Sequence, residues 1–329
     1  MSRSLSVRHD CFKLNPPFRI SRGVKTAADV VTVTIEEDGV TGRGEGVPYA
    51  RYGETVESAR AQAESARNLV EQGGDRTALL TELPAGAARN AIDCALWDLE
   101  AQRSGTSVAT MISAPEPEAV ASALTIVIDT PARMAGAAAA LAPAPLLKVK
   151  VNADDPAAAI RALRAAAPDA MLIVDPNESW DRVLVEAMQP VLVETRVSLL
   201  EQPCSAEDDG WLADFTPAVP ICADEAVHVA ADVARVANRY QAVNVKLDKA
   251  GGLTAALDLA RAARAAGLGL MTGCMVSSSL SIAPAFHVAR MSDFADLDGP
   301  LWLQDDLAGG VSNDRGYLVP PRTGFWGTV

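Results

Sequence analysis

From about Ala119 onwards, short apolar runs alternate along the chain with alanine-rich runs of helical character. Because parallel strands need crossover connections, this order predicts an α/β fold, a parallel barrel of the (β/α)8 type. An open doubly wound sheet is the alternative, but no G-x-G-x-x-G motif follows the first strand. The helical runs include residues 156–166, 230–238 and 253–266. The apolar runs recur roughly every 25 positions and centre on Ile126, Val149, Ile173, Leu199, Ile221, Val245, Leu270 and Ala295.

The first 110 or so residues show a different pattern, which predicts a separate α+β unit. β-branched runs between Leu5 and Val47, with Asp38-Gly39 as a hairpin signal, predict a small antiparallel meander. Two stretches rich in Gly, Pro and Arg, residues 15–23 and 46–53, are expected to be irregular loops. Helical spacing and terminal glycines then predict two helices, over residues 54–72 and 87–103.

These patterns divide the chain into three parts. Residues 1–112 form the N-terminal α+β domain, and residues 113–300 form the barrel, which we expect to carry catalysis. Residues 301–329 are rich in Gly and Pro, and we expect this C-terminal segment to return to the first domain.

Composition narrows the class of protein. The 329 residues, 49% of them hydrophobic, suffice for a large core, and the net charge of −13 argues against a nucleic-acid partner. We find no apolar run of membrane-spanning length, and residues 1–14 hold no apolar segment typical of export. The five widely spaced cysteines suit reduced thiols, so we expect a cytoplasmic protein. The sequence does not fix the oligomeric state and is compatible with a homo-oligomer.

Two lysines on one predicted strand, Leu146–Val151, give the first chemical signal. Side chains alternate along a strand, so Lys148 and Lys150 point to the same face. Because like charges repel, Lys148 would lower the pKa of Lys150 and make it a base near neutral pH. An edge strand with two solvated lysines is the simpler alternative.

Charged residues recur where the predicted barrel strands end, which is where such barrels carry their chemistry. Three carboxylates that converge there would repel one another unless a cation neutralised them. All-oxygen ligands favour a hard ion, so we expect one Mg²⁺ per subunit, with Mn²⁺ as the other candidate. Three solvated acids at loop starts are the alternative. The strand-end residues are Lys150, Asp175, Glu201, Asp224, Lys246 and the pair Asp296 and Asp298.

The positions of two lysines suggest the reaction. Strands two and six of an eight-stranded ring lie opposite each other, so Lys150 and Lys246 would face each other across the barrel mouth. A substrate carbon between them has a base on each face, and its configuration could be inverted by 1,1-proton transfer. The carbanion would be held as an enediolate on Mg²⁺.

Several motifs resemble those of the muconate-lactonising subgroup of the enolase superfamily, and the resemblance covers nearly the whole chain. Within that subgroup the chain is most similar to the dipeptide epimerases of the L-Ala-D/L-Glu type. The resemblance implies a modified (β/α)7β barrel with the N-terminal unit as a capping domain. The motifs are Lys148-Val149-Lys150, Asp175-Pro176-Asn177-Glu178, Glu201-Gln202-Pro203, Asp224-Glu225 and Lys246 to Gly252, with residues 48–54 and 83–91 of the capping domain.

The resemblance also assigns substrate contacts. It implies that Asp296 and Asp298 hold the α-ammonium group of a small dipeptide. A lyase whose substrate lacks an amine would not need these two carboxylates. It implies that Arg22 pairs with the side-chain carboxylate of a C-terminal glutamate, a contact that suits arginine, although Arg19 and Arg51 lie in similar loops.

Three polar residues near the strand ends complete the predicted site. Asn177 and Asn244 are candidates to support the metal ligands. Thr125, near the end of the first strand, either contacts substrate or only packs within the strand. The chain departs from the family pattern at two points. Residues 273–278 lack an acid after the seventh strand, which bears on the choice of dipeptide. Pro176 follows Asp175 and should stiffen that loop.

Together these expectations describe an Mg²⁺-dependent dipeptide epimerase. It would invert the C-terminal residue of L-Ala-L-Glu or L-Ala-D-Glu in the recycling of peptidoglycan peptides. The alternatives are an o-succinylbenzoate synthase or cycloisomerase on the same scaffold, an epimerase for other dipeptides, and a barrel that binds a peptide without catalysis.

Overall fold

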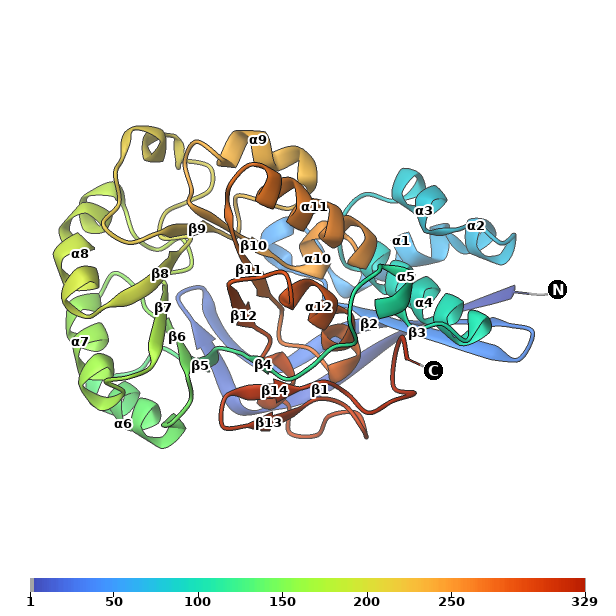
Figure 1. Ribbon diagram of the computed structural model, residues 1–329, viewed down its shortest axis with the longest axis horizontal. Coiled ribbons are helices and arrows are strands. Elements are labelled where there is room, and N and C mark those ends of the chain that lie inside the picture. Colours follow the sequence, from blue (N-terminus) through green and yellow to red (C-terminus); the bar gives the residue numbers. More distant parts are fainter. Residues whose placement is uncertain (1–2, 329) are drawn as a thin grey trace.

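The computed structural model describes residues 3–328, and Met1, Ser2 and Val329 lie outside the described residues (Figure 1). Its N-terminal part is the predicted antiparallel meander, with β1 (Arg3–Ile20), β2 (Gly23–Glu37) and β3 (Val40–Gly46) paired in that order. Asp38 and Gly39 form the tight β2–β3 turn, both with positive φ. Helices follow, together with the short 3-10 helix η1 (Ala50–Tyr52): α1 (Val56–Ser65), α2 (Arg67–Glu71), α3 (Arg76–Glu82), α4 (Ala87–Ser104) and α5 (Val108–Met111).

The expectation of an irregular loop over residues 15–23 is wrong. β1 continues to Ile20, and a register shift against β2 between Lys13 and Phe18 accommodates the two prolines. β1 is an edge strand, where a residue without an N–H is tolerated. The hairpin tip is therefore short, with Ser21 and Arg22 in the turn. The helix expected over residues 54–72 is interrupted at Ala66, which separates α1 from α2.

Glycines explain how α4 packs on the meander. A Cβ atom at Gly42 or Gly44 would lie 2.2 Å from the carbonyl oxygen of Ala95 or Ala91, respectively. β3 therefore approaches the backbone of α4 closely because these positions have no side chain. Ala91 and Ala95 are themselves fully buried, so the contact is made between small residues on both sides.

The remainder is the predicted barrel, and all eight strand predictions are confirmed. The strands pair in parallel in sequence order. Backbone pairing of Ser122 and Ala123 with Ala295 joins the first strand to the last and closes the ring. The strands are β5 (Leu124–Ile126), β6 (Leu146–Lys150), β7 (Met171–Asp175), β8 (Val197–Glu201), β9 (Ile221–Ala223), β10 (Ala242–Val245), β11 (Gly269–Gly273) and β12 (Phe294–Asp296).

α-Helices cover the outside of the barrel, but two of the connections contain a 3-10 helix in their place. The β8–β9 connection contains the 3-10 helix η2 (Gly210–Asp214), and β12 is followed by the 3-10 helix η4 (Gly299–Trp302). The eighth strand thus lacks a covering α-helix, as a (β/α)7β barrel requires. The other crossovers contain α6 (Pro131–Leu141), α7 (Pro156–Ala166), α8 (Arg182–Glu194), η3 (Ala230–Asp232), α9 (Val233–Val236), α10 (Leu247–Ala250), α11 (Leu253–Ala265) and α12 (Ser279–Ala289).

The C-terminal segment runs back along the molecule to the N-terminal domain (Figure 1). Its two strands, β13 (Ser312–Asp314) and β14 (Tyr317–Val319), form a small sheet with β4 (Val120–Ala121). Near its end, the Trp326 indole donates to the carbonyl of Arg43 at 3.0 Å, and the Gly327 N–H donates to the Asp98 carboxylate at 2.8 Å. The tail thus binds α4 and β3 directly.

Buried polar side chains join the two domains from the barrel side as well. The Asp248 carboxylate on α10 accepts from the Val47 N–H and from the Asn90 amide, both at 2.8 Å. The Arg89 guanidinium on α4 donates to the carbonyls of Ala250 and Gly251 at 2.6 and 3.0 Å. Because buried polar groups need partners, these bonds specify how the domains dock.

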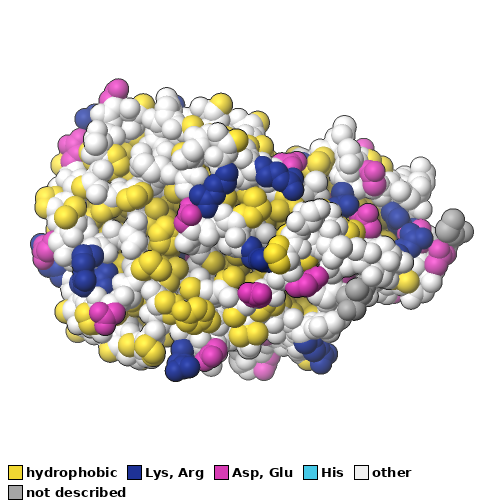
Figure 2. All heavy atoms as spheres, in the orientation of Figure 1, with side chains coloured by type: hydrophobic (Ala, Val, Ile, Leu, Met, Phe, Trp, Pro, Cys, Tyr) yellow, Lys and Arg dark blue, Asp and Glu magenta, His cyan; other side chains and the backbone are white. Residues whose placement is uncertain are grey.

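One face of the outer surface mixes charged and apolar side chains. On the face in Figure 2, basic side chains lie singly or in small groups beside acidic ones, and apolar side chains gather over the barrel. Within residues 3–328, no helix is both long and apolar enough to cross a membrane.

Candidate active site

The three predicted carboxylate ligands lie together at the barrel mouth. Asp175 and Glu201 are the last residues of β7 and β8, and Asp224 follows β9, so three adjacent strands present them. All three side chains are buried. Burial and the neighbouring Asp175 raise the pKa of Glu201 to about 7, as expected for carboxylates packed together.

Lys148 compensates much of this negative charge. Its Nζ lies 2.6 Å from Glu201 Oε2, 2.7 Å from Asp296 Oδ2 and 3.1 Å from Asp175 Oδ2. Burial opposes its charge, but these carboxylates prevail and raise the pKa of Lys148 well above its usual range. Lys148 and Lys150 do point to one face, yet Lys148 is bound within a set of acids and is not simply a repelling neighbour.

The two predicted bases reach the same cavity from different sides of the ring. Lys150 on β6 lies 2.5 Å from Asp175 Oδ2, and Lys246, just after β10, lies 2.7 Å from Asp224 Oδ2. β6 and β10 are four strands apart in the eight-stranded ring, and both lysines line one cavity between barrel and capping domain. Each base is thus paired with a different predicted metal ligand.

The two asparagines contact the acids. Asn177 donates its backbone N–H to Asp175 Oδ1 at 2.8 Å and its amide to Asp175 Oδ2 at 3.2 Å. Asn244 donates its amide to Glu201 Oε1 at 2.8 Å. Gln202, which the sequence did not single out, accepts at 2.9 Å from the Asp224 N–H. Amide groups therefore fix all three carboxylate-bearing residues.

The donor set suits a hard divalent cation. Within residues 3–328, no three acidic, histidine or cysteine side chains already surround a common point at metal-ligand spacing. The lysine contacts explain this, because Lys148 and Lys150 draw the carboxylate oxygens toward their ammonium groups. The residues nevertheless fit the ion, since three buried carboxylates from adjacent strands offer only oxygen donors.

Asp296 and Asp298 line the same cavity. β12 ends at Asp296, and Asp298 lies beyond the strand at the start of η4, so strand alternation does not align them. The Asp298 carboxylate accepts at 2.7 Å from the Thr125 N–H and at 3.2 Å from the Trp302 indole. Burial and the adjacent Asp296 raise the pKa of Asp298 to about 6. Thr125 also lines the cavity.

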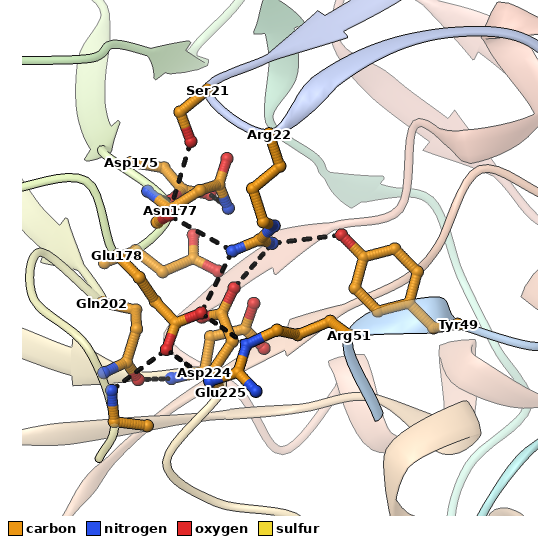
Figure 3. Close-up of polar contacts among 12 residues, drawn as sticks. Ser21, Arg22, Tyr49, Arg51, Asp175, Asn177, Glu178, Gln202, Asp224 and Glu225 are labelled. Atoms are coloured by element: carbon orange, nitrogen blue, oxygen red, sulfur yellow. Dashed lines mark hydrogen bonds and ion pairs between the residues drawn. The ribbon is translucent and has the colours of Figure 1, made fainter. Parts of the chain in front are cut away.

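Arg22 lies at the cavity rim, on the tip of the β1–β2 hairpin, and already has several partners (Figure 3). Its guanidinium donates at 2.8 Å to Glu225 Oε1 and at 3.3 Å to Glu178 Oε2. Burial opposes the charge, but the Glu225 carboxylate outweighs it and raises the pKa of Arg22. A substrate carboxylate would therefore have to share this arginine with two protein carboxylates.

Lys25 on β2 is a further cation on the cavity wall, which the sequence reading missed. Its ammonium lies 4.8 Å from the centre of the Tyr49 ring, and it has no hydrogen bond or ion pair among the described residues. Burial and the nearby Arg22 lower the pKa of Lys25. Its proximity to Arg22 follows from the hairpin, because Arg22 is in the turn and Lys25 lies just after it, near the start of β2.

Lys249 is another residue that sequence reasoning missed. It is fully buried on α10, and its Nζ lies 2.6 Å from Asp224 Oδ1 and 3.1 Å from the Asn244 carbonyl. Its place in the motif from Lys246 to Gly252 was a signal, but only the fold shows that it returns to Asp224. Asp224 is thus held by Lys246 and Lys249 together.

Comparison with known proteins supports this reading of the chain. A family model described as the mandelate racemase/muconate lactonizing enzyme N-terminal domain matches residues 2–113, and one described as enolase C-terminal domain-like matches residues 132–325. The chain is 46% identical over 318 residues to the L-Ala-D/L-Glu epimerase of Escherichia coli (strain K12), covering 96% of this chain and 99% of that one. It is 40% identical over 301 residues to the N-acetyl-D-glutamate racemase of a Pseudoalteromonas species, covering 91% and 95%.

Solved structures agree. An enolase family member from Agrobacterium tumefaciens with homology to dipeptide epimerases, solved with sodium and L-Ala-L-Glu, superposes with a TM-score of 0.96 at 44% identity, covering 99% of this chain and 100% of that one. A dipeptide epimerase from Enterococcus faecalis, solved with Mg and L-Leu-L-Tyr, gives 0.90 at 29% identity, covering 98% and 97%. The chain therefore belongs to the mandelate racemase and muconate lactonizing branch of the enolase superfamily, and within it to the isomerases that act as racemases and epimerases.

Proposed function

We propose that this protein is an Mg²⁺-dependent dipeptide epimerase that interconverts L-Ala-L-Glu and L-Ala-D-Glu. The observation that carries the proposal is the placement of Lys150 and Lys246 on strands four apart around one cavity that also contains Asp296 and Asp298. Relatives that act on the same dipeptide, or are solved with it, cover nearly the full chain.

The two lysines perform the proton transfers. Lys150 removes the α-proton from one face of the C-terminal residue, and Lys246 delivers a proton to the opposite face; the roles reverse for the other epimer. Asp175, Glu201 and Asp224 would hold Mg²⁺, which supplies electrostatic stabilisation for the negative charge that develops on the substrate carboxylate. The solved Enterococcus faecalis relative contains Mg, which supports this choice of ion.

Charges on two parts of the cavity wall support the choice of substrate. Asp296 and Asp298 on the barrel offer carboxylates to an α-ammonium group, and a bound cation would favour the ionised form of Asp298. Arg22 and Lys25 on the capping domain add positive charge, which suits the side-chain carboxylate of glutamate. Both contacts belong to the proposal, as do the supporting roles of Asn177, Asn244, Thr125 and Lys148.

One observation favours a second candidate, an N-acylglutamate racemase. Lys148 already pairs with Asp296 at 2.7 Å, which reduces the negative charge available to an ammonium group. An N-acyl substrate has no ammonium to place there, and the Pseudoalteromonas relative acts on such a compound. The buried Asp298 nevertheless remains beside the cavity, and for this reason the dipeptide is preferred.

The proposed activity suggests a cellular role. L-Ala-D-Glu is a unit of bacterial cell-wall peptides, so the enzyme would serve the recycling of peptidoglycan peptides. The five cysteines are unpaired in the structure, which suits a cytoplasmic enzyme.

The test is an NMR assay in D₂O with L-Ala-L-Glu, L-Ala-D-Glu and N-acetyl-L-glutamate as separate substrates. We expect both dipeptides to be epimerised with deuterium entering the glutamate α-position, and activity to vanish with a chelator and return with Mg²⁺. Faster turnover of N-acetylglutamate would favour the second candidate. Inversion of the dipeptide with no deuterium incorporation would contradict the two-base mechanism.

A further inference from the structure

The carboxylate of Glu178 joins three parts of the molecule that lie far apart in sequence (Figure 3). Arg51 on η1 makes a two-pronged contact with it, at 2.9 Å to Oε2 and 3.0 Å to Oε1. Arg22 at the hairpin tip donates to Oε2 at 3.3 Å, and the Ala206 N–H in the β8–β9 connection donates to Oε1 at 3.0 Å. One acid thus holds two segments of the capping domain against the barrel: the hairpin tip with Arg22 and η1 with Arg51. These are called the capping segments below.

The backbone that carries Glu178 is unusual. Asn177 and Glu178 have φ values of 48° and 66°, a left-handed conformation that non-glycine residues seldom adopt. Bonds on both sides hold this turn, because the Glu178 N–H donates to the Gln202 carbonyl at 2.9 Å and the Asn177 carbonyl accepts from Arg22 at 3.2 Å. A strained turn persists only where its surroundings determine it.

The same turn fixes a predicted metal ligand. Asn177 contacts both oxygens of Asp175, and Glu178 is the next residue along the chain. The residue that binds the capping segments and the residue that orients Asp175 are therefore neighbours in one turn, and displacement of either must move the other.

We propose that Glu178 is a positioning residue that couples closure of the capping segments to the orientation of Asp175. Its pairing with Arg51 and Arg22 holds the hairpin tip and η1 over the cavity. Through the turn at Asn177, the same pairing holds Asp175 in place. The inference rests on the proposed function for its choice of substrate, but the coupling itself is a property of the fold.

Glu207 provides a matched control. Its carboxylate also contacts Arg51, at 3.4 Å, but 81% of its side chain is exposed, compared with 10% for Glu178. Glu178→Gln and Glu207→Gln therefore each remove one carboxylate from the same arginine. Exposed ion pairs contribute little, so only the first variant should have an effect.

The experiment compares both variants with the wild type. In Glu178→Gln we expect faster hydrogen–deuterium exchange over residues 15–25 and 48–53 without substrate, weaker Mg²⁺ binding by calorimetry, and a KM for L-Ala-L-Glu raised about tenfold with kcat nearly kept. Arg51→Lys, which keeps the charge but loses the two-pronged contact, should give an intermediate KM. Glu207→Gln should match the wild type in all three measurements.

Each contrary outcome is distinct. Unchanged exchange in Glu178→Gln would overturn closure by this residue, and unchanged Mg²⁺ affinity would overturn the link to Asp175. If Glu178→Gln lowers kcat and the melting temperature but leaves KM unchanged, Glu178 has only a structural role. If the wild type turns over no dipeptide, the proposed function fails, while the exchange and calorimetry still decide the role of Glu178.

Discussion

The interior of the barrel contains two layers that differ in chemistry, although the same strands supply both. At the start or in the middle of the strands the inner layer is apolar, with Leu146, Ile173, Leu199, Cys222, Ala242 and Met271 among its members. Two or four residues further along these strands, charged side chains take the same inward face, among them Lys148, Lys150, Asp175, Glu201, Asp224 and Lys246. Strand alternation keeps both sets inward, so only residue type changes between them.

The comparison shows how one scaffold separates stability from chemistry. The side chains of the apolar layer have no polar groups that need hydrogen-bond partners, and their close packing fixes the positions of the strands. The charged layer is buried as well, and its charges are tolerated because lysines and carboxylates pair within about 3 Å. If this division is real, changes in the two layers should have separable effects.

The largest effect is expected from the charged layer. Lys150→Ala or Lys246→Ala should lower the rate of epimerisation at least ~1,000-fold, because each removes the acid–base group on one face of the carbon. The remaining lysine should still exchange the α-proton of one epimer, as measured by NMR in D₂O. Lys13→Ala, at an exposed lysine of β1, is the control. Normal exchange of both epimers in either variant would argue against one base on each face.

A change in the apolar layer should act on stability. Ile173→Ala should lower the free energy of unfolding by about 2–4 kcal/mol, because it removes methyl groups from a closely packed site. Thermal unfolding measures this, with Val183→Ala on the exposed face of α8 as the control. KM for the dipeptide, measured well below the melting temperature, should stay near that of the wild type. A large rise in KM without loss of stability would show that the layers are not separable.

A pH-dependent effect is expected at the contact between capping domain and barrel. The Glu45 carboxylate on β3 accepts at 2.9 Å from the Ser278 N–H at the start of α12, and burial raises the pKa of Glu45 to about 8. The folded state then keeps a proton that the unfolded chain loses above its usual pKa of 4.5. Stability should therefore fall between about pH 4.5 and pH 8, with Glu45 contributing at most about 1.4 kcal/mol per pH unit.

Denaturant unfolding at several pH values tests this. Glu45→Gln removes the titrating group and should flatten the decline, whereas Glu82→Gln on the exposed surface of α3 should leave it unchanged. Equal slopes in all three proteins would assign the pH dependence to other groups.

Local periodicity accounts for what the sequence predicted well. The barrel strands could be recognised because each is a short apolar run. Their ends could be recognised because a lysine or an acid follows the run directly, as Asp175 follows Val174. Period-two alternation places Lys148 and Lys150 together without knowledge of the fold. The family and the isomerase class followed from these motifs and are confirmed by the comparisons.

The contacts that the sequence did not reveal are long-range. Glu178 meets Arg51 across 127 positions, and no local pattern marks such a pair. The misread hairpin has a different cause. Pro16 and Pro17 are typical of a loop, yet an edge strand with a shifted register accommodates both. The sequence predicted Asp298 at the end of a strand, but β12 ends two residues earlier, at Asp296, and η4 begins at Gly299.

The tail that carries Trp326 bears on how a substrate reaches the lysines. The tail binds the capping domain through Trp326, and Asp248 of the barrel binds the same domain at a second place. These two contacts oppose separation of the two domains. The short segments around Arg22 and Arg51, which we propose to close over the cavity, would then be the parts that move when a substrate enters. A small opening of this kind would admit a compact peptide and obstruct a long one.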